Sequence, residues 1–403
     1  MKKRILQIVL LAFLPLLLHA QEFRVIGYLP QYKISFIDKI CIEYLTHLNI
    51  AFANPDSQGI IKTFKNDIKP AVERAHYYNV KALISLGGGH LLPEWKTAWT
   101  KYLQPSNRSY FISNIMYYVR ENRLDGADVD LEWKDVDKNY SGFILELRDS
   151  LHAAGKLITA ALPGKHRYAN ISDEALHAFD FINLMAYDAC GPWNPHRPGQ
   201  HSSIEFASKC IAYWTEKQGM APGKLSLGLP CYGYNFNDPS KVYGFYYRSM
   251  LERQLEYMNA DQVGGMYYNG IPTIKSKTQM AFEKTGGVMM WELSQDAVDS
   301  LEEYSLLKAV YETVQVNREL IKEDFSIRVY PNPHTHFVYI ESNKAEEEAE
   351  INLFNQQGIL ILNKRQKLDV PVIHLETKDL KSGKYPLTVK IGNTVQMHTI
   401  IKS

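Results

Sequence analysis

The fold of this chain is decided by one stretch, Leu124–Trp133, which reads LDGADVDLEW. Hydrophobic and acidic residues alternate along it, which predicts a strand whose successive side chains point to opposite faces. Asp128, Asp130 and Glu132 then share one face, with neighbouring Cα atoms roughly 6.6 Å apart at about 3.3 Å per residue. An amphipathic strand with its polar face in water gives the same pattern, so the rest of the chain must decide between the two.

Short apolar runs alternate with helical patterns on both sides of this stretch. The runs that we expect to be strands are 23–28, 45–52, 81–86, 124–133, 156–161, 179–185, 225–229 and 286–291. Helical spacing is predicted over 68–78, 108–122, 140–154, 203–218, 273–285 and 301–314. This order predicts an α/β chain whose parallel sheet closes as a (β/α)8 TIM barrel. A doubly wound open sheet is the alternative, but no GxGxxG follows the first strand.

A barrel changes how Asp128, Asp130 and Glu132, which we call the acidic row, are interpreted. Both faces of every barrel strand are covered, so the carboxylates must point into the barrel or its mouth. A buried carboxylate without partners costs several kcal/mol, which makes three of them hard to explain by structure alone. Barrel enzymes place their catalytic groups at the C-terminal ends of the strands. The row therefore predicts a catalytic site.

Composition excludes several other classes of function. The 403 residues carry a net charge of +1, with 45 basic against 44 acidic side chains, so no global field favours nucleic acid or a membrane surface. Cys41, Cys190, Cys210 and Cys231 form no CxxC pair, and we expect neither a metal nor a cofactor. The sequence is compatible with one disulfide and equally with buried free thiols. We expect a monomer.

The ends of the chain predict export and a second domain. Residues 2–4 are basic, 5–18 are apolar, and Ala20 ends a small-residue region, which predicts a signal peptide over 1–20; a retained anchor is the alternative. The barrel is expected over 21–315, followed by a polar linker over 316–324. Residues 325–403 alternate short apolar runs with turn signals, which predicts a small all-β sandwich.

The acidic stretch resembles the signature of family-18 glycoside hydrolases, the chitinase family. Asp125–Glu132 is similar to the family's DxxDxDxE motif, and Ser85–Gly88 resembles its SxGG motif. Met185–Asp188 resembles its MxYD motif, and Trp291 stands where the family has its strand-eight tryptophan. The four motifs follow the family's order along 23–315.

The resemblance implies a secreted, retaining hydrolase that cleaves β-1,4 linkages beside N-acetylglucosamine in chitin or chitooligosaccharides. Glu132 would be the general acid and base, and neighbouring carboxylates would raise its pKa. The substrate's own acetamido group would be the nucleophile, as in substrate-assisted catalysis. Asp130 would orient that group, Tyr187 would hydrogen-bond its oxygen, and Asp128 would tune the charge of the cluster.

Other residues are expected to line the substrate site. They are Asp188, Trp291, Tyr28, Met185, Ser85, Gly88, Phe52 and Trp133. For Ser85 and its glycines, a tight turn is the simpler explanation, whereas an indole such as Trp291 stacks well on a sugar ring. Residues 232–286 are expected to hold one helix and a tyrosine-rich loop, without the α+β insertion of many relatives. A shallow groove suited to internal cleavage would follow.

The tail resembles the C-terminal sorting domain of type IX secretion substrates. The similar segments are VYPNP at 329–333, DLKSGKY at 379–385 and IIK at 400–402, while Pro386 departs from the usual pattern. This implies passage through the periplasm, recognition by the type IX machinery, and a secreted or cell-surface location. A carbohydrate-binding sandwich is the alternative, but no tryptophan follows Trp291.

Two other functions fit the same motifs. An endo-β-N-acetylglucosaminidase acting on N-glycan cores would use the same carboxylates. A non-catalytic, lectin-like protein is the other candidate, but such relatives typically lose the terminal acid, which this chain retains as Glu132.

Overall fold

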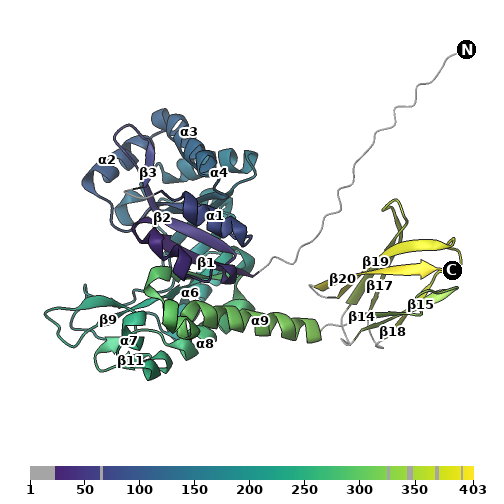
Figure 1. Cartoon of the computed structure of the whole chain (residues 1–403). Coiled ribbons are helices and arrows are strands. Elements are labelled where there is room, and N and C mark those ends of the chain that lie inside the picture. The colour runs from purple at the N-terminus through teal and green to yellow at the C-terminus, as the bar shows by residue number, and fades with distance from the viewer. Residues whose placement is uncertain (1–22, 64–66, 325–326, 343–347, 368–371, 392–393) are drawn as a thin grey trace, which may run out of the picture. The chain divides into compact units, whose positions relative to one another are not determined.

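The computed structural model describes residues 23–63, 67–324, 327–342, 348–367, 372–391 and 394–403 (Figure 1). Residues 23–319 form one compact unit, the barrel domain, and the chain from Leu320 onward forms another. The predicted signal peptide lies outside the described residues. Within the described ranges, no helix combines the length and the apolar character needed to cross a bilayer.

The barrel domain is built on a closed parallel sheet. Strand β1 pairs with β2 on one side and with β13 on the other, which closes the barrel and excludes the open sheet. Its eight parallel strands, within the described residues, are β1 (Arg24–Pro30), β2 (His47–Pro55), β4 (Lys81–Gly87), β5 (Gly126–Asp130), β6 (Leu157–Pro163), β7 (Phe181–Met185), β8 (Leu225–Pro230) and β13 (Gly287–Trp291). The short β3 (Ile61–Thr63) pairs antiparallel with β2. The (β/α)8 prediction is confirmed.

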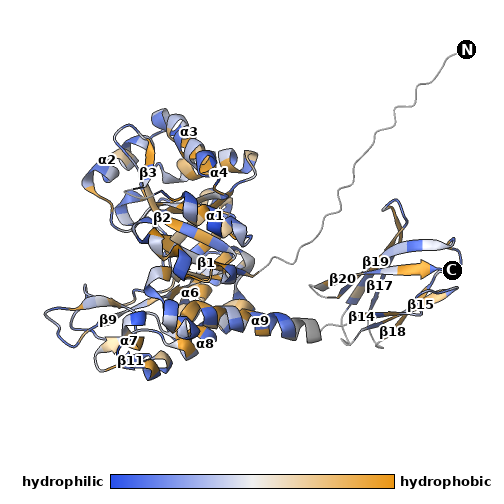
Figure 2. Cartoon of the chain, in the orientation of Figure 1, coloured by the Kyte–Doolittle hydropathy of each residue, from blue (hydrophilic) through white to orange (hydrophobic). Residues whose placement is uncertain are grey.

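Helices surround this sheet and cover it with one face each. The helices are α1 (Lys69–Tyr77), α2 (Pro93–Tyr102), α3 (Pro105–Glu121), α4 (Tyr140–Ala153), α5 (Asp173–Ala178), α6 (Ile204–Ala212), α8 (Ile271–Lys284) and α9 (Leu306–Asp324). Helix α3 buries Phe111, Ile112, Ile115 and Val119, which recur at the spacing of one helical face. Figure 2 shows hydrophobic and hydrophilic residues along each of α8 and α9, as this packing requires.

The expectation for residues 232–286 is wrong. Between β8 and α8 the chain folds a four-stranded antiparallel sheet in the order β10-β9-β12-β11. Its elements are β9 (Tyr232–Asn235), β10 (Tyr243–Tyr246), α7 (Arg248–Leu251), β11 (Gln262–Val263) and β12 (Met266–Tyr267). We call this segment the insertion; Figure 1 places it at the opposite end of the barrel domain from α2 and α3. The argument for internal cleavage from a shallow groove loses its basis.

The expected linker over 316–324 is helical. We predicted that the last barrel helix ends at Val314, but α9 continues to Asp324. Val314 and Asn317 are buried, and the Asn317 amide donates to Gln279 of α8 at 2.6 Å, so one face of the helix stays packed on the barrel at least to Asn317. Composition alone does not separate such a polar helix from a linker.

The C-terminal domain consists of two antiparallel sheets around one core, which confirms the predicted sandwich. One sheet has the order β14-β15-β18 and the other β17-β16-β19-β20. The strands are β14 (Ile327–Tyr330), β15 (Phe337–Ser342), β16 (Glu348–Phe354), β17 (Leu360–Lys367), β18 (Val372–Glu376), β19 (Gly383–Ile391) and β20 (Thr394–Lys402). Inward residues of both sheets, such as Ile340 and Leu387, meet in the core.

Candidate active site

The acidic row stands at the carboxyl end of β5. Ala127, Val129 and Leu131 are fully buried on one face of the strand, and Asp128 and Asp130 are also buried on the other. Glu132 follows with extended backbone (φ −123°, ψ 158°), so the alternation continues past the last residue of the strand. The solvated-face interpretation is therefore wrong, because Asp128 and Asp130 are buried and Glu132 is only partly exposed.

Asp128 is held by hydroxyl groups from three other barrel strands. Tyr28 of β1 and Ser85 of β4 each donate to Oδ2 at 2.7 Å, and Thr159 of β6 donates to Oδ1 at 2.6 Å. The Asn183 amide of β7 donates to the Tyr28 hydroxyl at 3.0 Å and lies 3.4 Å from Asp128 Oδ1. Burial raises the pKa of Asp128, and these hydrogen bonds oppose the rise.

Burial and neighbouring charges raise the pKa of both Asp130 and Glu132. Asp130 Oδ1 is buried and has no hydrogen-bond partner among the described residues. Burial, and then the charges of Glu132 and Asp128, raise the pKa of Asp130 well above its usual range. Burial also raises the pKa of Glu132 to about 7, with a further contribution from Asp188. Burial is thus the larger cause for Glu132, where we expected neighbouring carboxylates.

The loop after β4 approaches the acid closely because it lacks side chains. Gly88 has φ +104°, and a Cβ there would lie 2.8 Å from the ring of Phe52. A Cβ on Gly89 would lie 2.6 Å from Glu132 Oε1. Gly88 and Gly89 therefore do more than form a tight turn, since Gly88 leaves room for the Phe52 ring and Gly89 leaves room for Glu132.

Asp188 is fixed by the insertion. The Tyr232 and Tyr234 hydroxyls of β9 donate to its Oδ1 at 2.6 and 3.0 Å. The buried His201 ring lies against both tyrosine rings, and its Nδ1 is 3.4 Å from the Asp188 backbone nitrogen. Asp188 itself has φ +63°, which is uncommon for a residue other than glycine. Both tyrosine hydrogen bonds end on Oδ1, and Asp188 Oδ2 has no hydrogen-bond partner among the described residues.

Most of the expected substrate-binding residues lie together. The rings of Phe52 and Tyr28 each lie 5.5 Å from the Trp291 ring, the former stacked on it. Tyr187 is buried beside this group, which the partly buried Met185 also contacts. Trp133 differs, because it is 63% exposed and its ring faces His166 at 6.3 Å. It therefore lies outside the cluster formed by the other predicted residues.

Sequence reasoning missed Thr159, Asn183 and His201. Thr159 and Asn183 are single polar residues at buried positions of otherwise apolar strands. Such a position is the one signal that could have found them, because a buried polar group needs a partner. His201 lies in a loop, where the sequence offers no comparable pattern.

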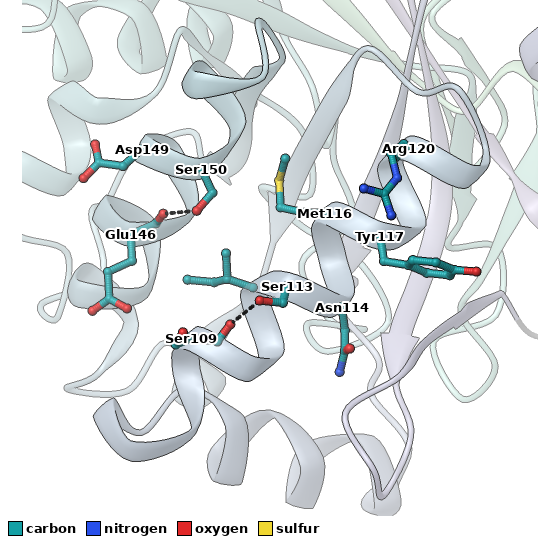
Figure 3. A pocket seen from close by; sticks show the side chains of 10 residues that line it. Ser109, Ser113, Asn114, Met116, Tyr117, Arg120, Glu146, Asp149 and Ser150 are labelled. Carbon is teal, nitrogen blue, oxygen red and sulfur yellow. Dashed lines mark hydrogen bonds between the residues drawn. The ribbon is translucent and has the colours of Figure 1, made fainter.

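A hollow of about 680 Å³ lies away from these residues, between α3 and α4 (Figure 3). Ser109, Ser113 and Arg120 of α3 line it together with Glu146 and Ser150 of α4. The two hydrogen bonds drawn there join hydroxyls to carbonyls of the same helix, one turn back. It includes no residue of the acidic row.

The described residues hold no group of three or more histidine, cysteine or acidic side chains suited to a metal ion. All four cysteines lie in the described region and are free thiols. The sequence left a disulfide open, and the structure pairs none of the four cysteines.

Comparisons with known proteins give matches for both domains. Residues 24–296 match the family described as glycosyl hydrolases family 18, and residues 328–403 match the secretion system C-terminal sorting domain. The GH18 chitinase ChiB from the chitin utilization locus of Flavobacterium johnsoniae is 44% identical, with a TM-score of 0.71, over 74% of this chain and 96% of that one. A chitinase from Bacteroides thetaiotaomicron is 33% identical, with a TM-score of 0.64, over 73% and 96%.

A curated relative extends the comparison. A chitinase-like effector of Moniliophthora roreri is 26% identical over 230 residues, which are 50% of this chain and 55% of the relative. The chain thus spans about half the length of that relative. The sorting domain indicates a secreted or cell-surface protein.

Proposed function

The chain belongs to glycosyl hydrolase family 18, and on that premise we propose that it cleaves β-1,4 linkages beside N-acetylglucosamine in chitin or chitooligosaccharides. The observation that carries the proposal is the acid at the end of β5: Glu132, with a pKa of about 7, follows the buried Asp130 with its unpartnered oxygen. The two solved structures named above are both chitinases, which favours chitin over an N-glycan core.

In the proposed mechanism, Glu132 donates its proton to the glycosidic oxygen as the bond to the anomeric carbon breaks. The acetamido oxygen of the same sugar forms the new bond to that carbon, which gives an oxazolinium ion. Glu132, now ionised, takes a proton from water as the water opens this ring, and the configuration is retained. Asp130 would accept the acetamido N–H through Oδ1, and Tyr187 would donate to the acetamido oxygen.

The surrounding residues have supporting roles in this proposal. Trp291, backed by Phe52 and Tyr28, would carry the sugar at the cleavage point on its ring face. Asp188 would present Oδ2 to the sugar or to Glu132. Ser85 and Gly88 would act through Asp128 and Phe52, and Met185 would border the pocket for the acetamido group.

Localisation and assembly complete the proposal. The chain would cross the inner membrane with a signal peptide over 1–20, pass the periplasm, and leave through the type IX machinery, which would recognise residues 325–403. The barrel domain would act as a monomer over 21–315.

A direct comparison of substrates tests the proposed function. Soluble chitooligosaccharides and a high-mannose glycoprotein are each incubated with the enzyme, and the products are separated by mass. We expect shortened chitooligosaccharides; release of intact glycans without chitin cleavage would reject the proposal in favour of an endo-β-N-acetylglucosaminidase. Binding without any cleavage would point to a lectin-like protein.

A further inference from the structure

A row of aromatic rings crosses the outward face of the β14-β15-β18 sheet in the C-terminal domain. Tyr330, Tyr339 and His374 occupy directly paired positions on the three strands. Their ring centroids are 5.7 Å apart from Tyr330 to Tyr339 and 5.6 Å apart from Tyr339 to His374. Phe337 contacts Tyr339 at 5.3 Å and His374 at 4.9 Å. We call these four residues the aromatic row; Figure 1 labels its strands.

The aromatic row lies outside the buried core of the domain. The alternate residues of the same strands, among them Val338, Ile340 and Leu375, point inward and are at most 1% exposed. Tyr330 and Phe337 point outward and are 41% and 37% exposed. Aromatic surface left in water is a cost unless a ligand covers it, and clustered exposed rings mark binding sites.

Charge on this face is balanced. Arg328 stands opposite Glu341 in the register of β14 and β15, so a positive and a negative side chain are neighbours there. Glu376, opposite Phe337, makes an ion pair with Lys378 at 3.0 Å. The face therefore offers no net charge to a polyanion or a membrane, but it combines ring surfaces with hydrogen-bonding groups at their edges. That combination suits a neutral polymer with apolar ring faces and polar edges.

We propose that the aromatic row binds an extended β-1,4-linked chain of N-acetylglucosamine. Its ring-to-ring step is close to the length of one sugar in such a chain. Neighbouring rings are tilted by 43° and 41° to each other, so a chain that twists along its length would contact successive rings. The row spans three strands, roughly 10 Å at about 4.8 Å per strand, which is enough for a short run of sugars. The choice of this sugar rests on the function proposed for the barrel.

The tail would then combine sorting with carbohydrate binding. No tryptophan follows Trp291, but tyrosine, phenylalanine and histidine from three strands supply the rings instead. The sorting role and the binding role use one domain, and polymer binding would keep an exported enzyme beside its substrate.

Adsorption of the full chain to powdered chitin tests the inference. All proteins carry Glu132→Gln, so that the polymer stays intact, and the free protein is measured after sedimentation. Tyr330→Ala with Tyr339→Ala is expected to weaken adsorption about tenfold or more, because two stacking contacts are lost. The same pair with Glu132 present is expected to cleave soluble chitopentaose at the parental rate.

Matched variants protect the test against misfolding. Tyr330→Phe with Tyr339→Phe keeps both rings and is expected to adsorb within about twofold of the parent, while Phe337→Ala removes a different ring and weakens adsorption. Met397→Ala on the other sheet, where Met397 is 67% exposed, is expected to change nothing. Parental adsorption by the alanine pair overturns the inference. So does an alanine pair that adsorbs like the parent but is no longer exported, since the row would then recognise protein.

The inference and the proposed function can fail separately. If the unmodified chain leaves chitopentaose intact while the alanine pair still loses adsorption, the barrel's function is wrong and the aromatic row stands. If chitopentaose is cleaved and the alanine pair adsorbs like the parent, the aromatic row is wrong and the barrel's function stands.

Discussion

Tyr232 donates a 2.6 Å hydrogen bond to Asp188, which joins the insertion to the loop after β7. Asp188 is also the carboxylate whose charge adds to the effect of burial on Glu132. The insertion thus fixes a charge that acts on the proposed acid. A segment that we expected to hold one helix and a tyrosine-rich loop thus contacts a residue whose charge acts on Glu132.

Removing the charge of Asp188 is expected to change the pH dependence of hydrolysis. The Asp188 charge helps to raise the pKa of Glu132 to about 7, so Asp188→Asn lowers that pKa. Since the general acid must be protonated, the alkaline limb of the kcat/KM profile moves to lower pH. Profiles on chitopentaose measure this shift. An alkaline limb that stays in place, or moves to higher pH, contradicts the assignment.

The tyrosine hydroxyls can be removed without changing charge. Tyr232→Phe is expected to lower kcat several-fold, because Asp188 loses its shorter hydrogen bond, worth about 1 kcal/mol. Tyr234→Phe, which removes the 3.0 Å bond, is the matched comparison and is expected to have the smaller effect. Equal kcat for both variants and the parent would show that Asp188 keeps its position without them.

Glu132 and Asp128 are expected to separate activity from stability. Glu132→Gln should lower kcat by about 10² or more, as for loss of a general acid, with an unchanged melting temperature. Asp128→Ala leaves the buried hydroxyls of Tyr28, Ser85 and Thr159 without their acceptor, and should cost about 3 kcal/mol of unfolding free energy at roughly 1 kcal/mol each. Denaturant unfolding measures the stability of both variants, and initial rates on chitopentaose measure kcat. Equal stability of the two variants would be inconsistent with the network described.

Gly89 offers a test of the space around the acid. A Cβ at this position would lie 2.6 Å from Glu132 Oε1, so Gly89→Ala must displace the carboxylate. We expect kcat to fall about tenfold or more, since small misplacements of catalytic groups are costly, while the fold survives. Gly155→Ala is unsuitable as a control because of its positive φ, whereas Gly199→Ala meets no atom within 4 Å and should retain parental kcat. Parental kcat in Gly89→Ala would refute the close approach.

Lys277 predicts a slope in stability at alkaline pH. Its ammonium is buried in α8, donating to Ser202 Oγ at 2.7 Å and to Asn269 Oδ1 at 2.6 Å, and burial lowers its pKa to about 7 from the ordinary 10.5. Between these values the unfolded chain binds more protons than the folded one, so this residue makes stability rise with pH. Unfolding free energies at several pH values from about 7 to 10 measure the slope in the parent and in Lys277→Met. A variant with the parental slope would show that the lysine is not its source.

The sequence predicted the barrel well because each strand carries its own apolar run. The insertion was hidden because β11 and β12 have two residues each, and β9 pairs with segments on both sides without regular alternation. Antiparallel pairing of such short segments depends on tertiary contacts. The extra turns of α9 were hidden for a related reason, since a polar helix and a polar linker share one composition.

The acidic row was predictable because alternation places its members on one face. Thr159 and Asn183 come from other strands, and each is a lone polar residue in its own segment, so their convergence on Asp128 and Tyr28 is a property of the closed sheet. The aromatic row was invisible in the same way, because its rings come from three strands. The acids of one strand and the residues near recognised motifs, such as Ser85 and Trp291, were found. Lone polar residues without a motif, such as Thr159 and Asn183, were not.

The hydroxyls that converge on Asp128 from β1, β4 and β6 also affect which residues of the acidic row can be lost during evolution. With Glu132 as the acid, as proposed, a descendant of this protein could lose Glu132 at little structural cost and survive as a binding protein. Losing Asp128 would instead weaken contacts across the barrel and expose the chain to proteolysis before a new role could be selected. Activity should therefore be lost from the end of the acidic row inward, with Glu132 decaying first and Asp128 outlasting the chemistry that it once supported.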